Sequence, residues 1–280
     1  MEMEVHELHG VYSISALTGM AQERRVHRVA VMIPMKAEAA PVADELGLEE
    51  QEESSIPSPL PAKVYKGQLS DGSAEVFVVH NGTSERYGVD HIGAYMSSLS
   101  TYAVCQHIKP NIVISAGTAG GFSERGGNVG DTYLASEFRC HDSRIPLEGF
   151  DKYGECALSA ARTENLRVRL TLKEGVCSSG SSLDCTEVDM GLLRKYRACA
   201  KDMEGAAVAF VSDLFHIPVM GLKTITDIVD GPRPSGSPLY FPSHPLFSLL
   251  TYLCLCIAYR PQSTSSARIC TLPLLRCARS

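Results

Sequence analysis

Short apolar, β-branched runs alternate with segments of helical periodicity along most of this chain, and this alternation limits its fold most strongly. Residues 26–33 predict a buried first strand, and residues 36–46 predict a helix that tolerates Pro41 only within its first turn. Strands that alternate with helices predict an α/β fold whose mostly parallel or mixed sheet is covered on both faces. The other predicted strands are residues 64–65, 74–80, 111–115, 132–138, 169–177 and 218–224, the other helices are residues 91–107, 187–199 and 204–215, and residues 49–61 are expected to form an exposed loop.

The composition is that of a soluble globular protein of 280 residues with a net charge of −6. An acidic balance argues against non-specific nucleic-acid binding, which needs clustered Lys and Arg. No stretch reaches the roughly 18 apolar residues of a membrane span. Residues 1–25 lack the apolar core of a secretory signal, so we expect a disordered N-terminal extension there. The ten cysteines show no CxxC pair and no metal spacing, which favours a reduced, cytoplasmic protein without a metal.

Two acidic residues stand at the ends of predicted elements. Glu204 opens the helix at residues 204–215, and Asp227 follows the strand at residues 218–224. The carboxyl ends of strands border the ligand crevice of an α/β sheet, so both acids are expected to face one site. Two acids at different depths can take different protonation states, which allows acid chemistry at neutral pH. Taken alone, each residue favours a plainer role, Glu204 at the helix N-terminus and Asp227 in a turn.

A glycine-rich stretch, residues 116–121, follows the predicted strand at residues 111–115. It is neither GxGxxG nor GxxxxGK[ST], so it is a weak signal for a dinucleotide or a nucleotide phosphate. One interpretation is a tight turn. The other is a backbone cradle for a small ligand, with the Thr118 hydroxyl as one polar contact. The residues alone favour neither.

A series of segments, taken in order, carries a resemblance to a known family. The chain resembles the 5′-methylthioadenosine/S-adenosylhomocysteine nucleosidases of the nucleoside phosphorylase superfamily, and the plant-type members most closely. The resemblance covers roughly residues 26–230 and rests on the order and spacing of the set rather than on any single motif. The segments are residues 31–39, 114–122, 129–131, 141–142, 179–184, 202–207 and 223–227.

The resemblance implies a single-domain α/β fold, a three-layer sandwich around a central mixed β-sheet, with no metal or organic cofactor. It also implies a homodimer, in which the loop at residues 141–150 would reach the pocket of the neighbouring subunit and help to bind the 5′-alkylthio group. The alternative is a loop that packs on its own subunit. The reaction implied is hydrolysis of the N-glycosidic bond of 5′-methylthioadenosine, and possibly of S-adenosylhomocysteine, as in methionine salvage. Adenine and methylthioribose would be the products of methylthioadenosine.

The resemblance also assigns the catalytic positions. Glu38 matches the carboxylate that orients and deprotonates the attacking water, and Thr118 matches a hydroxyl that lines that water. Asp227 matches the general acid at adenine N7, and Thr226 matches the hydroxyl that orients it. An aspartate is normally ionised at neutral pH, so Asp227 would need desolvation or a facing carboxylate to hold a proton.

The remaining site residues are implied as substrate contacts. Leu183 and the backbone of Asp184 match the segment that covers and reads the adenine edge. Met203 and Glu204 match the ribose contacts, and anionic Glu204 would favour the positive charge that develops on the sugar. Lys223 occupies a position where other members have Arg or Lys.

Three other functions stay open at this point. A purine nucleoside phosphorylase must bind phosphate where the hydrolase places water. A carboxylate such as Glu38 about 4 Å from a phosphate charge would cost on the order of 4 kcal/mol at an effective dielectric of 20. A non-catalytic storage protein would be free to lose Glu38, Glu204 and Asp227, which are all present. A sensor of adenine nucleosides is separated only by an assay.

Two departures from the family pattern qualify the resemblance. Ser181 replaces the usual Asp, which weakens the expected support for the adenine loop. Residues 231–280 contain no Asp, Glu, Lys or Asn and carry five arginines, so the composition changes abruptly there. We therefore divide the chain into an extension at residues 1–25, a catalytic domain at residues 26–230 and an atypical tail at residues 231–280 that is not the family's usual C-terminus.

Overall fold

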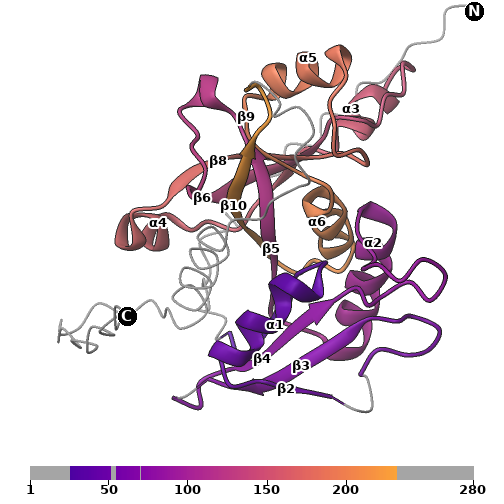
Figure 1. Ribbon diagram of the computed structural model, residues 1–280, viewed down its shortest axis with the longest axis vertical. Helices are drawn as coiled ribbons and strands as arrows, with labels where there is room; N and C mark the ends of the chain where they lie inside the picture. The colour runs from indigo at the N-terminus through magenta and orange to yellow at the C-terminus, as the bar shows by residue number, and fades with distance from the viewer. Residues whose placement is uncertain (1–25, 52–54, 70, 232–280) are drawn as a thin grey trace, which may run out of the picture.

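The computed structural model describes residues 26–51, 55–69 and 71–231, which form a mixed sheet with helices on both faces (Figure 1). Within them the strands join in the order β10-β6-β8-β9-β5-β1-β4-β3-β2, and β7 pairs with β6. The strands are β1 (Arg28–Met32), β2 (Glu49–Glu50), β3 (Lys63–Gln68), β4 (Glu75–His80), β5 (Ile112–Gly121), β6 (Thr132–Cys140), β7 (Leu158–Ser159), β8 (Lys173–Ser179), β9 (Ala198–Asp202) and β10 (Val219–Ile228). The helices are α1 (Lys36–Glu45), α2 (Ala94–Ala103), the π-helical turn η2 (Val104–Ile108), the 3-10 turn η3 (Ser123–Arg125), α3 (Phe150–Glu155), α4 (Glu164–Leu170), α5 (Glu187–Tyr196) and α6 (Gly205–Leu214).

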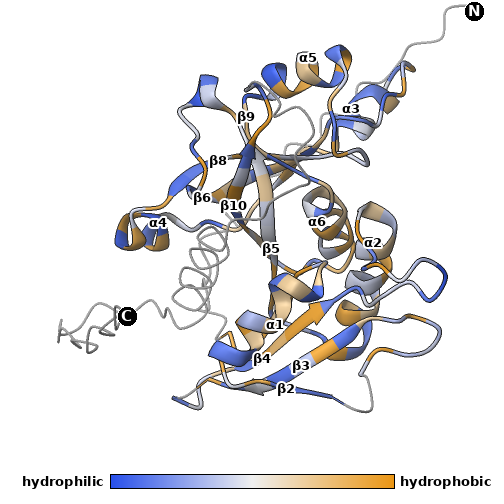
Figure 2. Cartoon of the chain, viewed as in Figure 1, coloured by the Kyte–Doolittle hydropathy of each residue, from blue (hydrophilic) through white to orange (hydrophobic). Residues whose placement is uncertain are grey.

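Alternate residues of β1 point into two separate cores, and this produces three layers. Val29 and Val31 pack in a cluster that contains Val42 of α1. Ala30 and its neighbours on the other face pack in a second cluster that contains Val208 of α6. Figure 2 shows apolar colouring along β4, which lies beside β1 in the sheet. The predicted α/β sandwich around a central mixed sheet is confirmed.

Five of the strands close into a ring, which the sequence pattern did not predict. β5 pairs with β10 in parallel, β10 pairs with β6, β6 with β8, β8 with β9, and β9 pairs back to β5 through an antiparallel contact. Closure of only five strands leaves little room inside the ring, because strands on opposite sides lie a short distance apart. Because β5 and β10 are parallel neighbours, their carboxyl ends lie side by side at one rim of the ring.

The boundaries of two predicted elements were wrong for one physical reason. The predicted strand at residues 169–177 is the end of α4 followed by β8, and the predicted helix at residues 187–199 ends at Tyr196 and is followed by β9. Thr171 and Arg197 adopt left-handed φ angles of 54° and 56° at these two helix ends. A left-handed residue terminates a helix even where the apolar periodicity continues. The short elements α3, α4 and β7 were not predicted.

Two further details near the N-terminal part of the domain differ from the predictions. Pro41 lies inside α1 rather than in its first turn. Its ring is exposed, and Ala37, whose carbonyl loses a partner, is also exposed, so water can satisfy that oxygen. The predicted loop at residues 49–61 begins with the edge strand β2, and Ile56 within it is buried.

The predictions for residues 1–25 and for the tail beyond Gly231 lie outside the described residues. Among the described helices, none combines the length and apolar character needed to span a bilayer.

We predict that Gly221→Ala destabilises the protein by about 1–3 kcal/mol, since overpacking a tight core costs this much. A Cβ at Gly221 of β10 would lie 2.6 Å from the Ala135 Cβ and 2.8 Å from the Phe138 Cζ, both on the adjacent strand β6. Urea unfolding midpoints measure the effect. Gly191→Ala is the matched control, because no atom lies within 4 Å of its Cβ on the exposed face of α5. Equal midpoints for the two variants would contradict the tight ring.

Candidate active site

The candidate site lies where β5 and β10 end next to the start of α6. The two strands are parallel, and their register sets Thr118 opposite Thr224 and Gly120 opposite Asp227, with an irregularity between Ile225 and Asp227. The carboxyl ends of adjacent parallel strands are the usual border of a ligand crevice in α/β proteins. The fold thus brings predicted residues from distant segments to one edge of the sheet.

Glu38 and Thr118 form the first contact of the site. Glu38 is buried in the first turn of α1, and its Oε1 accepts hydrogen bonds from the Thr118 hydroxyl at 2.6 Å and the Thr118 N–H at 3.2 Å. Burial raises the pKa of Glu38, although the Thr118 hydrogen bonds and the Lys223 charge oppose this. The carboxylate is therefore held in one orientation with Oε2 free of these two donors.

The glycine-rich stretch turns out to be the second half of β5, not a tight turn. Gly117 adopts a φ of 148°, and a Cβ there would lie 3.1 Å from the Glu38 Oε2. Glycine is needed because its backbone approaches a carboxylate closely. The backbone N–H of this stretch does cradle an anionic group, but the group is the Glu38 side chain of the same chain.

Glu204 is positioned differently from a capping residue. It is the N-cap residue of α6, yet its side chain makes no capping hydrogen bond, and its Oε1 instead accepts from the Gly93 N–H at 2.7 Å. The first amides of α6 are capped by Asp202, which accepts from Gly205 N at 2.8 Å, and by Ser179, which accepts from Ala206 N at 2.7 Å. The plain reading of Glu204 as a helix cap is therefore wrong.

The environment of Glu204 favours its protonated form. Burial and the Asp202 charge raise the pKa of Glu204 to about 7, while the Lys223 charge and the Gly93 N–H act in the opposite direction. Two raised carboxyl pKa values, those of Glu38 and Glu204, thus occur in one site. Perturbed acids of this kind are typical of catalytic sites.

A buried ion pair lies beneath these acids. The Lys223 ammonium is 2.7 Å from the Asp202 Oδ2 and donates to the Ser115 hydroxyl at 3.1 Å, while the Ser179 hydroxyl donates to the Asp202 Oδ1 at 2.5 Å. Burial would raise the pKa of Asp202, but the Lys223 ammonium holds it below its ordinary value. Lys223 was expected to contact the substrate. Its side chain is only 2% exposed and is engaged within the chain by Asp202 and Ser115.

Asp202 is a residue whose role the sequence analysis missed. It stands in the segment at residues 202–207 that was matched to the family, but only its neighbours Met203 and Glu204 were assigned contacts. An acid two residues before the N-cap of a predicted helix, together with a lysine in an apolar strand, was the available signal. Only the tertiary structure shows that Asp202 forms an ion pair with Lys223.

Asp227 and Thr226 lie at the rim as expected, with one difference. The Thr226 hydroxyl donates to the Asp227 Oδ1 at 3.1 Å and lies 3.4 Å from the Ala119 carbonyl oxygen. Asp227 is exposed, so the described residues do not supply the desolvation that was expected for a general acid. These residues orient the Asp227 carboxylate instead. The Thr226 hydroxyl holds Oδ1, and Oδ2 packs near the Gly120 backbone, 3.2 Å from where a Cβ of that glycine would stand.

The predicted base-covering loop is exposed and lies next to the end of β9. Leu183 is 60% exposed and Asp184 is exposed, whereas Met203 is half-buried beside Glu204. Lys201 of β9 donates to the carbonyls of Ser182 and Leu183, which places the loop over this rim.

Neither of two cavities in the structure contains these acids. A cavity of about 490 Å³ lies by the far end of α6, lined by Ala209, Asp213 and His216 among others, and one of about 370 Å³ lies by Lys36, Lys63 and His80. We locate the site from the convergent acids rather than from cavity volume, because the chemistry needs those groups. In the part of the chain that the structure describes, no group of three or more His, Cys, Asp or Glu side chains is arranged to hold a metal ion.

Comparison with known proteins identifies the family of the chain. The phosphorylase superfamily matches residues 28–238. A 5′-methylthioadenosine nucleosidase of Arabidopsis thaliana is 43% identical over 213 residues, 76% of this chain and 79% of the relative. A 5′-methylthioadenosine/S-adenosylhomocysteine nucleosidase of the same plant is 36% identical over 80% of this chain and 87% of the relative. The solved apo structure of Arabidopsis thaliana 5′-methylthioadenosine nucleosidase has a TM-score of 0.78 at 39% identity, covering 84% of this chain and 96% of that one.

The fold and the family match show that this chain is a member of the phosphorylase superfamily. Within that superfamily it belongs to the 5′-methylthioadenosine/S-adenosylhomocysteine nucleosidase family, as the resemblance of its ordered segments predicted.

We predict that Glu204→Gln removes a pH-dependent loss of stability. A carboxyl group whose folded pKa is raised from 4.5 to about 7 stabilises the fold fully below pH 4.5, and this contribution is lost as the pH rises through about 7. Between these limits, the unfolding free energy of the wild type should fall by up to about 3.5 kcal/mol relative to the variant, at about 1.4 kcal/mol per pKa unit. The glutamine can still accept from the Gly93 N–H.

Urea unfolding of both proteins from pH 4.5 to pH 8 measures this difference. Glu45→Gln, at the exposed end of α1, is the control and should run parallel to the wild type. Parallel curves for Glu204→Gln as well would contradict the raised pKa of Glu204.

Proposed function

We propose that this chain hydrolyses the N-glycosidic bond of 5′-methylthioadenosine and releases adenine and methylthioribose. The observation that carries this proposal is the Glu38–Thr118 contact. Glu38 Oε1 occupies both the hydroxyl and the N–H of Thr118, which are the donors that a bound phosphate would need at this point. A phosphate there would also meet a carboxylate about 4 Å away, at a cost on the order of 4 kcal/mol per charge.

Each acid then has a distinct task in the reaction. Glu38, held by Thr118, orients a water and takes its proton as the water attacks the sugar carbon. Glu204, in the ionised form that is also populated near its pKa of about 7, accepts from ribose hydroxyls and favours the positive charge that builds up on the sugar. Asp227 protonates the departing adenine, and the bound purine would cover its exposed carboxyl group and so provide the desolvation that the free chain lacks.

Substrate contacts complete the proposal. Leu183, the Asp184 backbone and Met203 bind the base and the sugar from the loop and from the start of α6. Lys223 acts indirectly, through Asp202. The catalytic unit is residues 26–230, and the enzyme would serve methionine salvage in the cytoplasm.

An adenine-release assay on the purified protein tests the function. We expect equal rates from methylthioadenosine with and without phosphate, and free methylthioribose as the sugar product. A rate that requires phosphate would identify a phosphorylase, and no adenine release would identify a storage or sensor protein. S-adenosylhomocysteine, assayed beside it, measures the tolerance for a longer 5′ substituent.

We predict that Asp227→Asn lowers turnover of methylthioadenosine by about 10²–10⁴-fold, the range typical of a lost general acid. The amide can hydrogen-bond the base but delivers no acidic proton, so binding of a non-hydrolysable analogue should persist in calorimetry. Asp213→Asn, an exposed aspartate at the far end of α6, is the matched control. Turnover above about a tenth of the wild-type rate would remove Asp227 from the mechanism.

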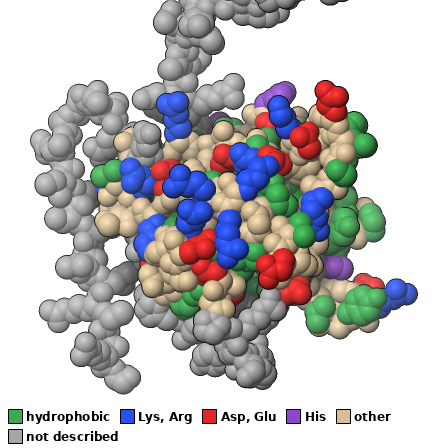
Figure 3. All heavy atoms as spheres, turned by 90° about the horizontal axis from the view of Figure 1, so that it is seen from above, with side chains coloured by type: hydrophobic (Ala, Val, Ile, Leu, Met, Phe, Trp, Pro, Cys, Tyr) green, Lys and Arg blue, Asp and Glu red, His purple; other side chains and the backbone are tan. Residues whose placement is uncertain are grey.

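We further propose that the chain forms a homodimer through α2. This helix places small polar residues inward and large apolar residues outward, with Tyr95 83%, Leu99 51% and Tyr102 54% exposed. In Figure 3 hydrophobic side chains gather on the right of the molecule, the side on which α2 lies in Figure 1. Leu147 and Phe150 of the loop at residues 141–150 are also more than half exposed. Exposed apolar surface of this extent is typical of an interface.

We predict that Leu99→Glu converts a wild-type dimer into a monomer, because a two-fold interface would bury two facing carboxylates and like charges there cost several kcal/mol. Sedimentation velocity at several concentrations measures this. Val168→Glu, which introduces the same charge on exposed α4, should remain dimeric. A wild type that sediments as a monomer at all concentrations would end the proposal.

A further inference from the structure

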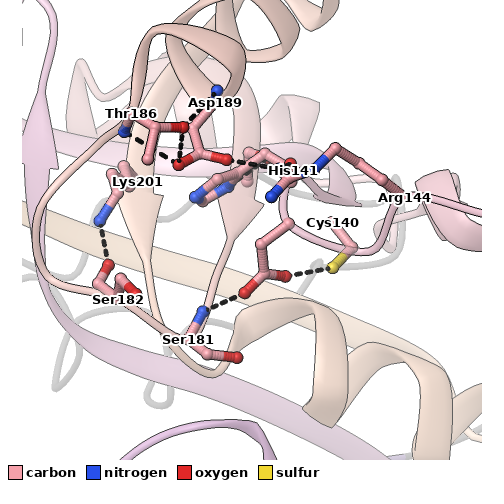
Figure 4. A network of polar contacts seen from close by, with 10 residues as sticks. Cys140, His141, Arg144, Ser181, Ser182, Thr186, Asp189 and Lys201 are labelled. Atoms are coloured by element: carbon pink, nitrogen blue, oxygen red, sulfur yellow. Dashed lines mark hydrogen bonds and ion pairs between the residues drawn. The ribbon is translucent and has the colours of Figure 1, made fainter.

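Lys201 is a buried lysine whose ammonium lies against the base-covering loop. Its side chain comes from β9 and is 5% exposed as a residue. The ammonium donates to the carbonyl of Ser182 at 2.7 Å (Figure 4) and to the carbonyl of Leu183 at 3.0 Å. Within the described residues no carboxylate forms an ion pair with it. A buried charge without a carboxylate partner is costly, so its use to hold two loop carbonyls calls for a functional reason.

The position of Lys201 connects it to the acid at the rim. Gly120 of β5 is paired with Lys201 of β9 on one side and with Asp227 of β10 on the other. Lys201 and Asp227 therefore flank the same glycine from neighbouring strands. A loop held by Lys201 must stand beside the place where Asp227 would meet the base.

The start of the loop is fixed independently of Lys201. A Cβ at Gly180 would lie 2.3 Å from the His141 Nε2, so the imidazole packs directly on the backbone there. Asp142 accepts from the Ser181 N–H at 2.5 Å (Figure 4). Burial and the Lys201 charge lower the pKa of His141, which is consistent with a neutral ring in this contact. Asp142 thus supplies support although Ser181 itself has no carboxylate.

The end of the loop is fixed by a second set of contacts. Thr186 and Asp189 form a capping box at the start of α5, and Arg144 donates to the Asp189 Oδ1 at 2.5 Å. With both ends anchored, the segment at residues 182–184 is left between them, and Lys201 is the side chain that sets its orientation.

The carbonyl held by Lys201 determines the direction of a particular N–H group. The Leu183 carbonyl and the Asp184 N–H belong to one planar trans peptide, so they point in opposite directions. An ammonium on the carbonyl fixes this plane and polarises the N–H, which makes it a better donor. A peptide N–H can only donate. It therefore favours a base edge that presents a ring-nitrogen acceptor, as N1 of adenine does, over one that presents N1–H, as hypoxanthine does.

We infer that Lys201 is a positioning residue that fixes the Leu183–Asp184 peptide and thereby makes the site select a 6-aminopurine over a 6-oxopurine. This inference rests on the proposed function, since it assigns the loop to the base. The residue acts through the loop and touches neither the reacting bond nor the sugar.

Lys201→Met, Lys201→Arg and a matched Lys195→Met control test the inference. Lys195 is an exposed lysine on α5. The assay compares hydrolysis of methylthioadenosine with that of methylthioinosine. We expect Lys201→Met to raise the KM for methylthioadenosine by about tenfold or more, the effect of losing charge-assisted hydrogen bonds, with kcat within about threefold. The preference for the adenine nucleoside should fall by a similar factor, and Lys201→Arg should recover most of it.

The melting temperature separates positioning from folding. The Ser182 and Leu183 carbonyls belong to exposed residues, so water can replace the ammonium and Lys201→Met should melt close to the wild type. Amide hydrogen exchange of residues 182–185 should accelerate in this variant and not in Lys195→Met. Unchanged KM and unchanged base preference would overturn the inference. A variant that loses kcat and stability together, with Lys201→Arg no better, would show a structural role and also overturn it.

The proposed function can fail separately. If the wild type releases no adenine, the hydrolase is excluded. Calorimetry of the wild type and Lys201→Met with free adenine and free hypoxanthine then tests whether Lys201 sets the base preference. Equal affinities of the wild type and Lys201→Met for adenine would overturn the inference in that case.

Discussion

The Lys223–Asp202 ion pair is the interaction on which the rest of the site depends. It joins β10 to the end of β9 inside the closed ring of strands, and both side chains are at most 2% exposed. Removing one partner of such a buried pair typically costs about 3–5 kcal/mol, because the other charge is left unpaired. Asp202 also caps α6 through Gly205 N, so the same ion pair holds the start of the helix that carries Glu204.

Burial raises the pKa of each acid in this region, but the net shift differs from one acid to the next. The adjacent Lys223 ammonium outweighs burial at Asp202 and lowers its pKa, whereas burial outweighs the Lys223 charge at Glu38 and Glu204 and raises theirs. The Lys223 ammonium thus lowers the pKa of several carboxyl groups, but by different amounts. This inequality allows neighbouring acids to hold different protonation states, which is what a glycosidic hydrolysis at neutral pH requires.

Much of the fold and part of the site could be predicted from the sequence. The short apolar runs fixed the core strands, since a buried β-branched run has few other solutions, and the ordered segments identified the family. The prediction failed where a single backbone angle overrides a pattern, as at Arg197, whose left-handed φ ends α5 and permits β9. It also did not identify the partner of Lys223, because a lysine in an apolar strand does not reveal which carboxylate it meets.

The sequence by itself determined the α/β class, the family and the presence of Glu38, Glu204 and Asp227 along one chain. Only the tertiary structure decided their environments: Glu38 is buried against Thr118, Glu204 is released from capping by Asp202, and Asp227 is exposed at the rim. The physical reason is that residue type sets what a group can do, whereas its protonation and orientation depend on neighbours brought by strand pairing from distant segments. The ring formed by β5, β6, β8, β9 and β10 is such a pairing, and local periodicity contains no information about its closure.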